Sequence, residues 1–121
     1  MRALHRARFV GGARDQFMPS ISVDRAGTVG ICYADRRDDP MNFKIAQYCS
    51  LSKDQGTRFE DSRQTKQSWF PTHDNDAFVN TFYMGDYDAT TADLTGMHEG
   101  FFTSFQVQVD QNPDVYGALV R

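Results

Sequence analysis

The sequence predicts an all-β protein built from antiparallel four-stranded meanders, and three observations support this fold class. Aromatic residues make up 13% of the 121-residue chain, with ten Phe and five Tyr, and such side chains suit a pleated, half-buried surface. Short apolar runs alternate with clusters of Gly, Asp, Asn and Pro, the residues at which a chain turns. No segment between residues 17 and 60 keeps the apolar period of a helix over ten residues.

Residues 16–60 are expected to form one complete meander. Its first two strands, 19–23 and 28–34, flank a turn with Gly27, and a third strand at 43–49 follows a polar loop. A short fourth strand is expected at 58–60. If the second and third strands pair about the centre of the loop, Cys32 and Cys49 face each other directly. A disulfide and two buried free thiols both remain open on this evidence.

The meander then restarts. We expect residues 1–15 to be a basic arm, 61–84 a polar connection and 85–121 a second, partial meander with strands at 87–92, 100–107 and 115–120. The order of strand, glycine turn, aromatic strand, polar loop and strand thus appears twice, at a spacing near 70 residues.

Charge and hydropathy exclude several classes of protein. Four arginines and no acid lie within residues 1–14, but the rest of the chain carries nine basic and sixteen acidic side chains. An acidic body argues against a nucleic-acid partner, because neutralising phosphates needs a basic face. No apolar run reaches the length of a membrane span, and no apolar stretch follows the basic arm as a signal peptide requires. The compartment stays unknown.

Residues 52–59 carry a spaced motif, S-x-D-x-G-x-x-F, formed by Ser52, Asp54, Gly56 and Phe59. In such a turn the aspartate accepts backbone N–H groups, the glycine supplies a positive φ, and the aromatic ring packs beneath the hairpin. This pattern is the Asp box, or bacterial neuraminidase repeat.

The Asp box, the segment 16–40 and the run 85–87 together resemble sialidase-like β-propellers. The resemblance covers about residues 16–121 and implies four-stranded blades with the Asp box between the third and fourth strands. It also implies a ligand site at the opposite edge, where the loop between the second and third strands and the connection between blades lie. The Asp box is then a structural element.

The resemblance assigns candidate residues to that edge. An arginine is a suitable ligand for a sugar carboxylate, because its guanidinium can bind both oxygens. Adjacent residues of an extended chain point to opposite faces, so only one of Arg36 and Arg37 is expected to reach a given pocket. For Asp35, Arg36 and Arg37 an ion-paired loop anchor is the structural alternative. The candidates are Asp35, Arg36, Arg37, Asp86 and Tyr87 for catalysis, and Arg36, Arg37, Asp38, Asp86 and Tyr87 for ligand binding.

A complete sialidase site is not expected. The early arginine motif of that family is absent, and of the two glutamates, Glu60 falls on the side of the Asp box. The expected function is therefore glycan binding without independent hydrolysis. A structural module that oligomerises through exposed blade edges and an exo-glycosidase active only as an assembled oligomer are the alternatives.

Size bears on the assembly. A closed propeller needs at least four blades, and this chain supplies about two, so we expect a homo-oligomer or a piece of a larger propeller. Asp74 and Asp76 offer oxygen ligands that calcium would accept, although a solvated polar turn is the alternative. No other cofactor is expected.

Overall fold

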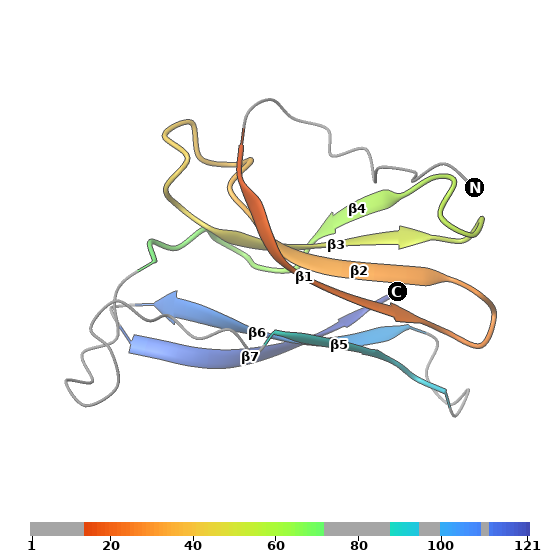
Figure 1. The fold of residues 1–121 in the computed structure, drawn as a ribbon. Coiled ribbons are helices and arrows are strands. Elements are labelled where there is room, and N and C mark those ends of the chain that lie inside the picture. The colour runs from red at the N-terminus through yellow and green to blue at the C-terminus, as the bar shows by residue number, and fades with distance from the viewer. Residues whose placement is uncertain (1–13, 72–87, 95–99, 110–111) are drawn as a thin grey trace.

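The computed structural model describes residues 14–71, 88–94, 100–109 and 112–121 (Figure 1). All regular secondary structure in these ranges is β-strand, which confirms the all-β fold class, and no helix there is long and apolar enough to cross a membrane. The strands are β1 (Gln16–Val23), β2 (Val29–Asp35), β3 (Ala46–Ser52), β4 (Glu60–Arg63), β5 (Ala89–Ala92), β6 (Phe101–Val109) and β7 (Asn112–Val120).

Strands β1 to β4 form a four-stranded antiparallel sheet in sequence order, which is the expected meander, but its fourth strand lies at Glu60–Arg63 and extends into the expected connection. The β1–β2 turn contains Gly27 at φ 86° and is closed by Asp24, whose carboxylate accepts the Thr28 N–H at 2.8 Å. Strand β1 begins at Gln16, earlier than expected. A register shift between Phe17 and Ser20, with Met18 at φ 53°, accommodates Pro19 within the strand.

The register between β2 and β3 pairs Cys32 with Cys49, as the loop centre predicts. The two residues form a disulfide, so the open choice between a bridge and free thiols is resolved. Both cysteines are fully buried and face the second sheet, where they pack with Ala92, Phe101 and Val120.

The third strand starts later than the sequence indicated. Strand β3 begins at Ala46, and Phe43 and Lys44 belong to the preceding loop. The reason is Asp39, whose carboxylate accepts the N–H groups of Met41, Phe43 and Lys44 and so offers this segment a local alternative to the sheet. These backbone hydrogen bonds hold the pKa of Asp39 below its usual value.

Strands β5, β6 and β7 form a second, three-stranded antiparallel sheet in sequence order. β6 carries alternate residues to two different environments. Phe101, Phe105 and Val107 are buried against the first sheet, whereas Phe102 is 45% exposed on the other face.

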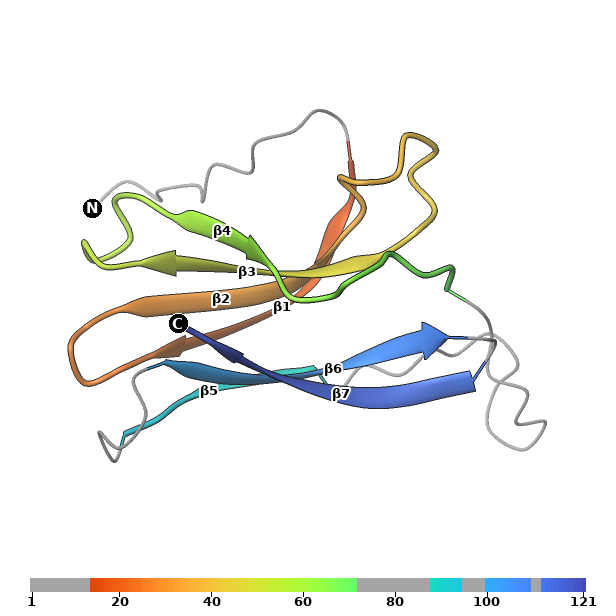
Figure 2. The same cartoon turned by 180° about the vertical axis from the view of Figure 1, so that it is seen from behind.

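The two sheets pack face to face, and β1 and β5 lie side by side at one margin (Figures 1 and 2). The Thr90 N–H donates to Ser20 Oγ at 2.8 Å, and the Ala92 N–H donates to Ser22 Oγ at 3.0 Å. Both pairs are separated by 70 residues. Since the separation is constant, β1 and β5 run in the same direction.

Loops emerge at two opposite ends of the sheets. The β2–β3 loop lies at one end, which we call the β2–β3 rim, and the turns after β1 and β3 lie at the other (Figure 1). The Asp box therefore faces away from Asp35–Arg37, as the meander topology predicts.

Candidate functional site

Asp35 and Arg37 form a closed ion pair at the start of the β2–β3 rim. The side chain of Asp35 is fully buried at the end of β2. One of its oxygens accepts the Arg37 backbone N–H at 2.6 Å, and the other accepts Arg37 Nε at 2.7 Å. This arrangement is the loop anchor that the sequence left as the structural alternative.

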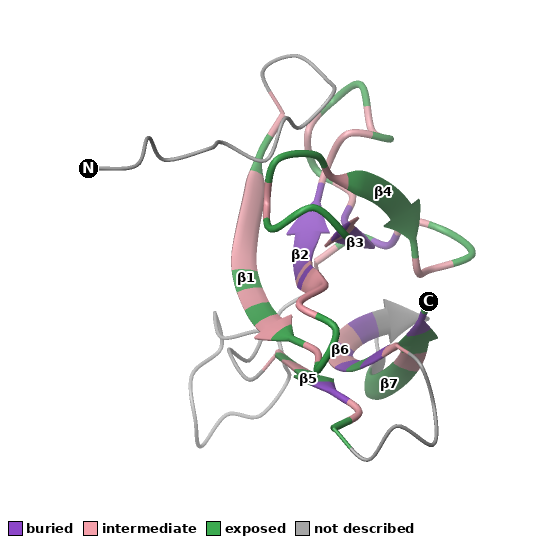
Figure 3. Cartoon of the chain, turned by 90° about the vertical axis from the view of Figure 1, so that its right-hand side faces the viewer, coloured by how far each residue is buried: buried purple, intermediate pink, exposed green. Residues whose placement is uncertain are grey.

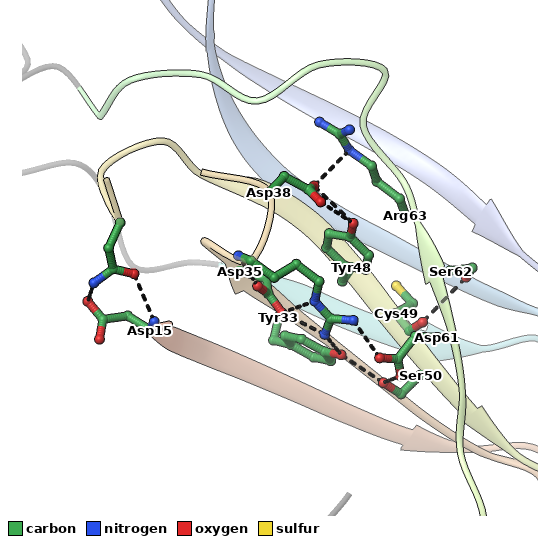
Figure 4. A network of polar contacts seen from close by, with 12 residues as sticks. Asp15, Tyr33, Asp35, Asp38, Tyr48, Cys49, Ser50, Asp61, Ser62 and Arg63 are labelled. Atoms are coloured by element: carbon green, nitrogen blue, oxygen red, sulfur yellow. Dashed lines mark hydrogen bonds and ion pairs between the residues drawn. The ribbon is translucent and has the colours of Figure 1, made fainter. Parts of the chain in front are cut away.

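The remaining donors of Arg37 are also engaged, and Figure 4 shows their partners Tyr33 and Asp61. Its Nη1 donates to Asp61 at 2.7 Å, and its Nη2 donates to the Tyr33 hydroxyl at 3.0 Å. Ser50 connects the other two partners, because it lies 2.9 Å from the Tyr33 hydroxyl and donates to Asp61 at 2.6 Å. Burial tends to lower the pKa of Arg37, but the hydrogen bonds to Asp35 and Asp61 outweigh it and raise this pKa.

Asp38 belongs to a neighbouring pair of contacts. It accepts the Tyr48 hydroxyl at 2.9 Å and lies 3.5 Å from Arg63 Nε. Burial and the hydrogen bond to Asp38 raise the pKa of Tyr48 to about 12. The guanidinium of Arg37 lies 4.2 Å from the centre of the Tyr48 ring and so connects the contacts of Arg37 with those of Asp38. We call the whole set the tyrosine–arginine network: Tyr33, Asp35, Arg37, Asp38, Tyr48, Ser50, Asp61 and Arg63.

Arg36 points to different partners from Arg37, as expected for adjacent residues of an extended chain. Its Nη1 donates to Asp15 at 3.0 Å, and its guanidinium lies 5.1 Å from the Phe17 ring. Its Nε has no hydrogen-bond partner among the described residues. Arg36 lines a shallow hollow of about 640 Å³ with Arg14, Asp15, Gln16 and Phe17, and its side chain is 24% exposed, against 14% for Arg37.

Exposed aromatic rings lie at the same rim. Phe43 is 57% exposed within the β2–β3 loop, and Phe70 is 56% exposed beside the backbone bridge between Ile45 and Trp69. The amino group of Lys44 lies 4.9 Å from the Phe70 ring. The sequence analysis did not single out these three residues. The sequence could have indicated Phe43 and Lys44 only if Asp39 had been recognised as the residue that holds them in a loop, so that β3 begins at Ala46.

Trp69 is unavailable to a ligand. It is buried and packs with Ala34, Ile45, Phe105 and Val107 between the sheets.

The Asp box has the internal hydrogen bonds expected of it. Ser52 donates to Asp54 at 2.8 Å, and Asp54 accepts the Arg58 N–H at 2.8 Å. The Gly56 N–H donates to Ser52 Oγ, with Gly56 at φ 87°, and Phe59 lies against Gly56. The N–H of Arg58 and the hydroxyl of Ser52 lower the pKa of Asp54. A separate hollow of about 340 Å³ lies beside this turn and is lined by residues that include Arg58, Glu60 and Arg121.

Asp88 is a further residue that the sequence did not single out. It lies immediately before β5 and lines a cavity of about 20 Å³ between the sheets. Burial raises its pKa, against a hydrogen bond from the Gln106 backbone N–H. Gln47 lines the same cavity, and its buried Nε2 has no partner within the described part of the chain.

Four of the candidate residues, Asp74, Asp76, Asp86 and Tyr87, lie outside the described residues. Within the described ranges, no group of three or more His, Cys, Asp or Glu side chains could hold a metal ion.

Comparisons with protein-family models, with curated proteins and with solved structures found no match for this chain. We therefore infer the function from the geometry of the rim and of the two sheets.

Proposed function

We propose that the two sheets are related to each other as neighbouring blades of a sialidase-like β-propeller are. The first sheet is a four-stranded meander with an Asp box between its third and fourth strands. The first strands of the two sheets run in the same direction at a constant separation of 70 residues, and the sheets pack face to face. Adjacent blades around a propeller axis are related in the same way.

Within this framework, we propose that the β2–β3 rim binds a glycan that carries a carboxylate. The observation that carries the proposal is the combination of exposed rings and cations at this rim. Phe43 and Phe70 expose more than half of their surface, Lys44 lies beside Phe70, and Arg36 lies in the β2–β3 loop with one side on a shallow hollow. Aromatic rings can stack on the apolar faces of sugar rings, and a guanidinium can bind a carboxylate through two hydrogen bonds.

The proposal assigns binding and no hydrolysis to this chain. Asp35 and Arg37 would have to break several short hydrogen bonds to contact a substrate. Removing partners from a buried charge is costly, so these two residues hold the loop that presents Arg36.

Isothermal titration calorimetry with sialylated and neutral oligosaccharides tests the proposal. We expect binding of the sialylated glycan, and Arg36→Ala should weaken it by roughly tenfold, because a hydrogen bond to a charged group contributes about 1.5–3 kcal/mol. Phe43→Ala should weaken the binding of both the sialylated and the neutral oligosaccharides. Arg58→Ala is the matched control, since it removes an exposed arginine at the opposite rim and should leave the affinity unchanged.

Two results would contradict the proposal. The first would be a wild-type chain that binds no glycan. The second would be an Arg58→Ala variant whose binding is weakened as much as that of Arg36→Ala. Release of fluorophore from a sialoside would replace binding alone with the exo-glycosidase alternative.

A further inference from the structure

The two outward faces of the paired sheets differ in character. On the outward face of the first sheet, Tyr33 and Tyr48 are buried, and the guanidinium of Arg37 lies over the Tyr48 ring. The edge strand β4 is short, and all four of its residues, Glu60–Arg63, are exposed (Figure 3). The tyrosine–arginine network thus closes this end with charged and polar groups, as a terminal repeat does in a repeat protein.

Among the described residues, none covers the outward face of the second sheet in this way. By the register of β5, β6 and β7 it consists of Ala89, Thr91, Phe102, Ser104, Gln106, Val115, Gly117 and Leu119. Val115 is 83% exposed, Phe102 45% and Leu119 39%. None of these eight residues is charged. We call this surface the open face.

The internal repeat indicates what the open face is suited for. The 70-residue separation that relates β1 to β5 also relates Cys32 to Phe102 and Cys49 to Leu119. Cys32 and Cys49 are direct cross-strand neighbours in the first sheet, and Phe102 and Leu119 are direct cross-strand neighbours in the second. In the first sheet this pair is buried against the second sheet. The positions of the open face are therefore equivalent to those positions of the first sheet that pack against a neighbouring sheet.

The open face has a ridge beside a depression. A hollow of about 390 Å³ is lined by Ala89, Thr91, Phe102, Ser104, Gly117 and Leu119. The register places Phe102 and Leu119 in one row across the strands, and Ala89, Ser104 and Gly117 in the next row. A two-fold axis between the rows would place the large side chains of one copy over the small residues of the other.

We infer that a second copy of this chain covers the open face, in a symmetric dimer whose two second sheets pack face to face. An isologous contact places the same patch of both copies against itself, so charges of one sign on that patch would lie close together, and an uncharged face avoids this repulsion. The alternative partner surface within a second copy is the outward face of the first sheet. That surface is occupied by the tyrosine–arginine network, and covering it with Phe102 and Leu119 would desolvate charges without pairing them. The inference is independent of the glycan proposal.

Multi-angle light scattering and sedimentation equilibrium on the full chain test this inference. We expect the wild-type protein to have twice the 13.8 kDa mass of one chain. Phe102→Asp should weaken dimerisation by about tenfold or more, because it would bury an unpaired carboxylate in the contact. Phe43→Asp is the matched control, since it makes the same change at a ring of similar exposure on the β2–β3 rim, and it should leave the mass unchanged.

A second variant protects against misfolding of the first. Ser104→Arg adds a long, charged side chain at the small-residue row without removing an apolar one, and it should also yield monomers with the circular dichroism spectrum of the wild type. The inference fails if the wild-type chain is monomeric, if its mass is that of three chains, or if the dimer survives both substitutions.

Discussion

Among single residues, Arg37 has the largest set of partners in the tyrosine–arginine network. It neutralises Asp35, whose side chain has no exposure, and connects the second strand to Asp61 on β4. Arg36, the neighbouring residue, is ion-paired with Asp15, whose side chain is 58% exposed. The two arginines therefore have different importance for stability despite their adjacency.

We predict that Arg37→Ala lowers the free energy of unfolding by about 3–5 kcal/mol, because it leaves a buried carboxylate without its partner. Arg36→Ala should cost about 1 kcal/mol or less, since exposed ion pairs contribute little. Urea denaturation of both variants measures the difference. Equal losses in the two variants would refute the structural role of Arg37.

Asp88 should make stability depend on pH. Burial raises its folded pKa above the ordinary value of 3.8, so the folded chain holds this proton more tightly than the unfolded chain does. At low pH both states are protonated, and Asp88 does not lower the free energy of unfolding. As the pH rises past the unfolded pKa this free energy falls, and the loss is complete above the folded pKa. Asp88→Asn should therefore raise the melting temperature at pH 7, and the gain should disappear near pH 3. A gain that is equal at both pH values would exclude this cause.

The sequence could predict part of the site at this scale. The alternation of side chains along an extended chain correctly predicts that Arg36 and Arg37 contact different partners. It cannot predict which of the two side chains is fully hydrogen-bonded within the fold. That outcome depends on Tyr33, Ser50 and Asp61, which three different strands bring together. Phe43 and Lys44 were missed because their exposure depends on the hydrogen bonds of Asp39, a loop detail that apolar periodicity does not reveal.

Among the elements, the β2–β3 hairpin is the best specified by sequence. The central turn residues fix its register, so the cross-strand position of Cys32 and Cys49 could be predicted even though their redox state could not. The bridge closes a segment with a sequence separation of 17 residues. It thus joins two neighbouring strands in the middle of the hydrophobic contact between the sheets.

Reduction of this disulfide should lower the free energy of unfolding by about 3 kcal/mol, the size expected for a loop of this length. Denaturant titrations with and without dithiothreitol measure the loss. The Cys32→Ala/Cys49→Ala double variant is the control, because reductant should have no further effect on it. A wild-type curve that reductant leaves in place would show that the bridge does not stabilise the fold.

For the whole molecule, the decisive relationship is the constant 70-residue separation between the first strands of the two sheets. The repeat of turns and aromatic strands made this spacing visible in the sequence, because each unit repeats one order of strands and loops. The packing of the sheets was not predictable in the same way. It depends on Gly30, which nothing in the local pattern distinguishes from a glycine that weakens a strand.

Gly30 lets the two sheets approach each other at Phe101. A Cβ atom at this position would lie 2.8 Å from the Phe101 ring, which is itself fully buried. Gly30→Ala should therefore lower the free energy of unfolding by about 1–3 kcal/mol through overpacking. Gly117→Ala is the control within a strand, because its nearest atom would be the Thr103 carbonyl oxygen at an ordinary 3.9 Å. It should change stability by less than about 1 kcal/mol, in the stabilising direction, by restricting the unfolded chain. Both substitutions are best compared by urea denaturation in the Phe102→Asp background, so that self-association through the open face does not contribute. Equal effects at the two glycines would mean that the sheets do not meet at Gly30 and Phe101.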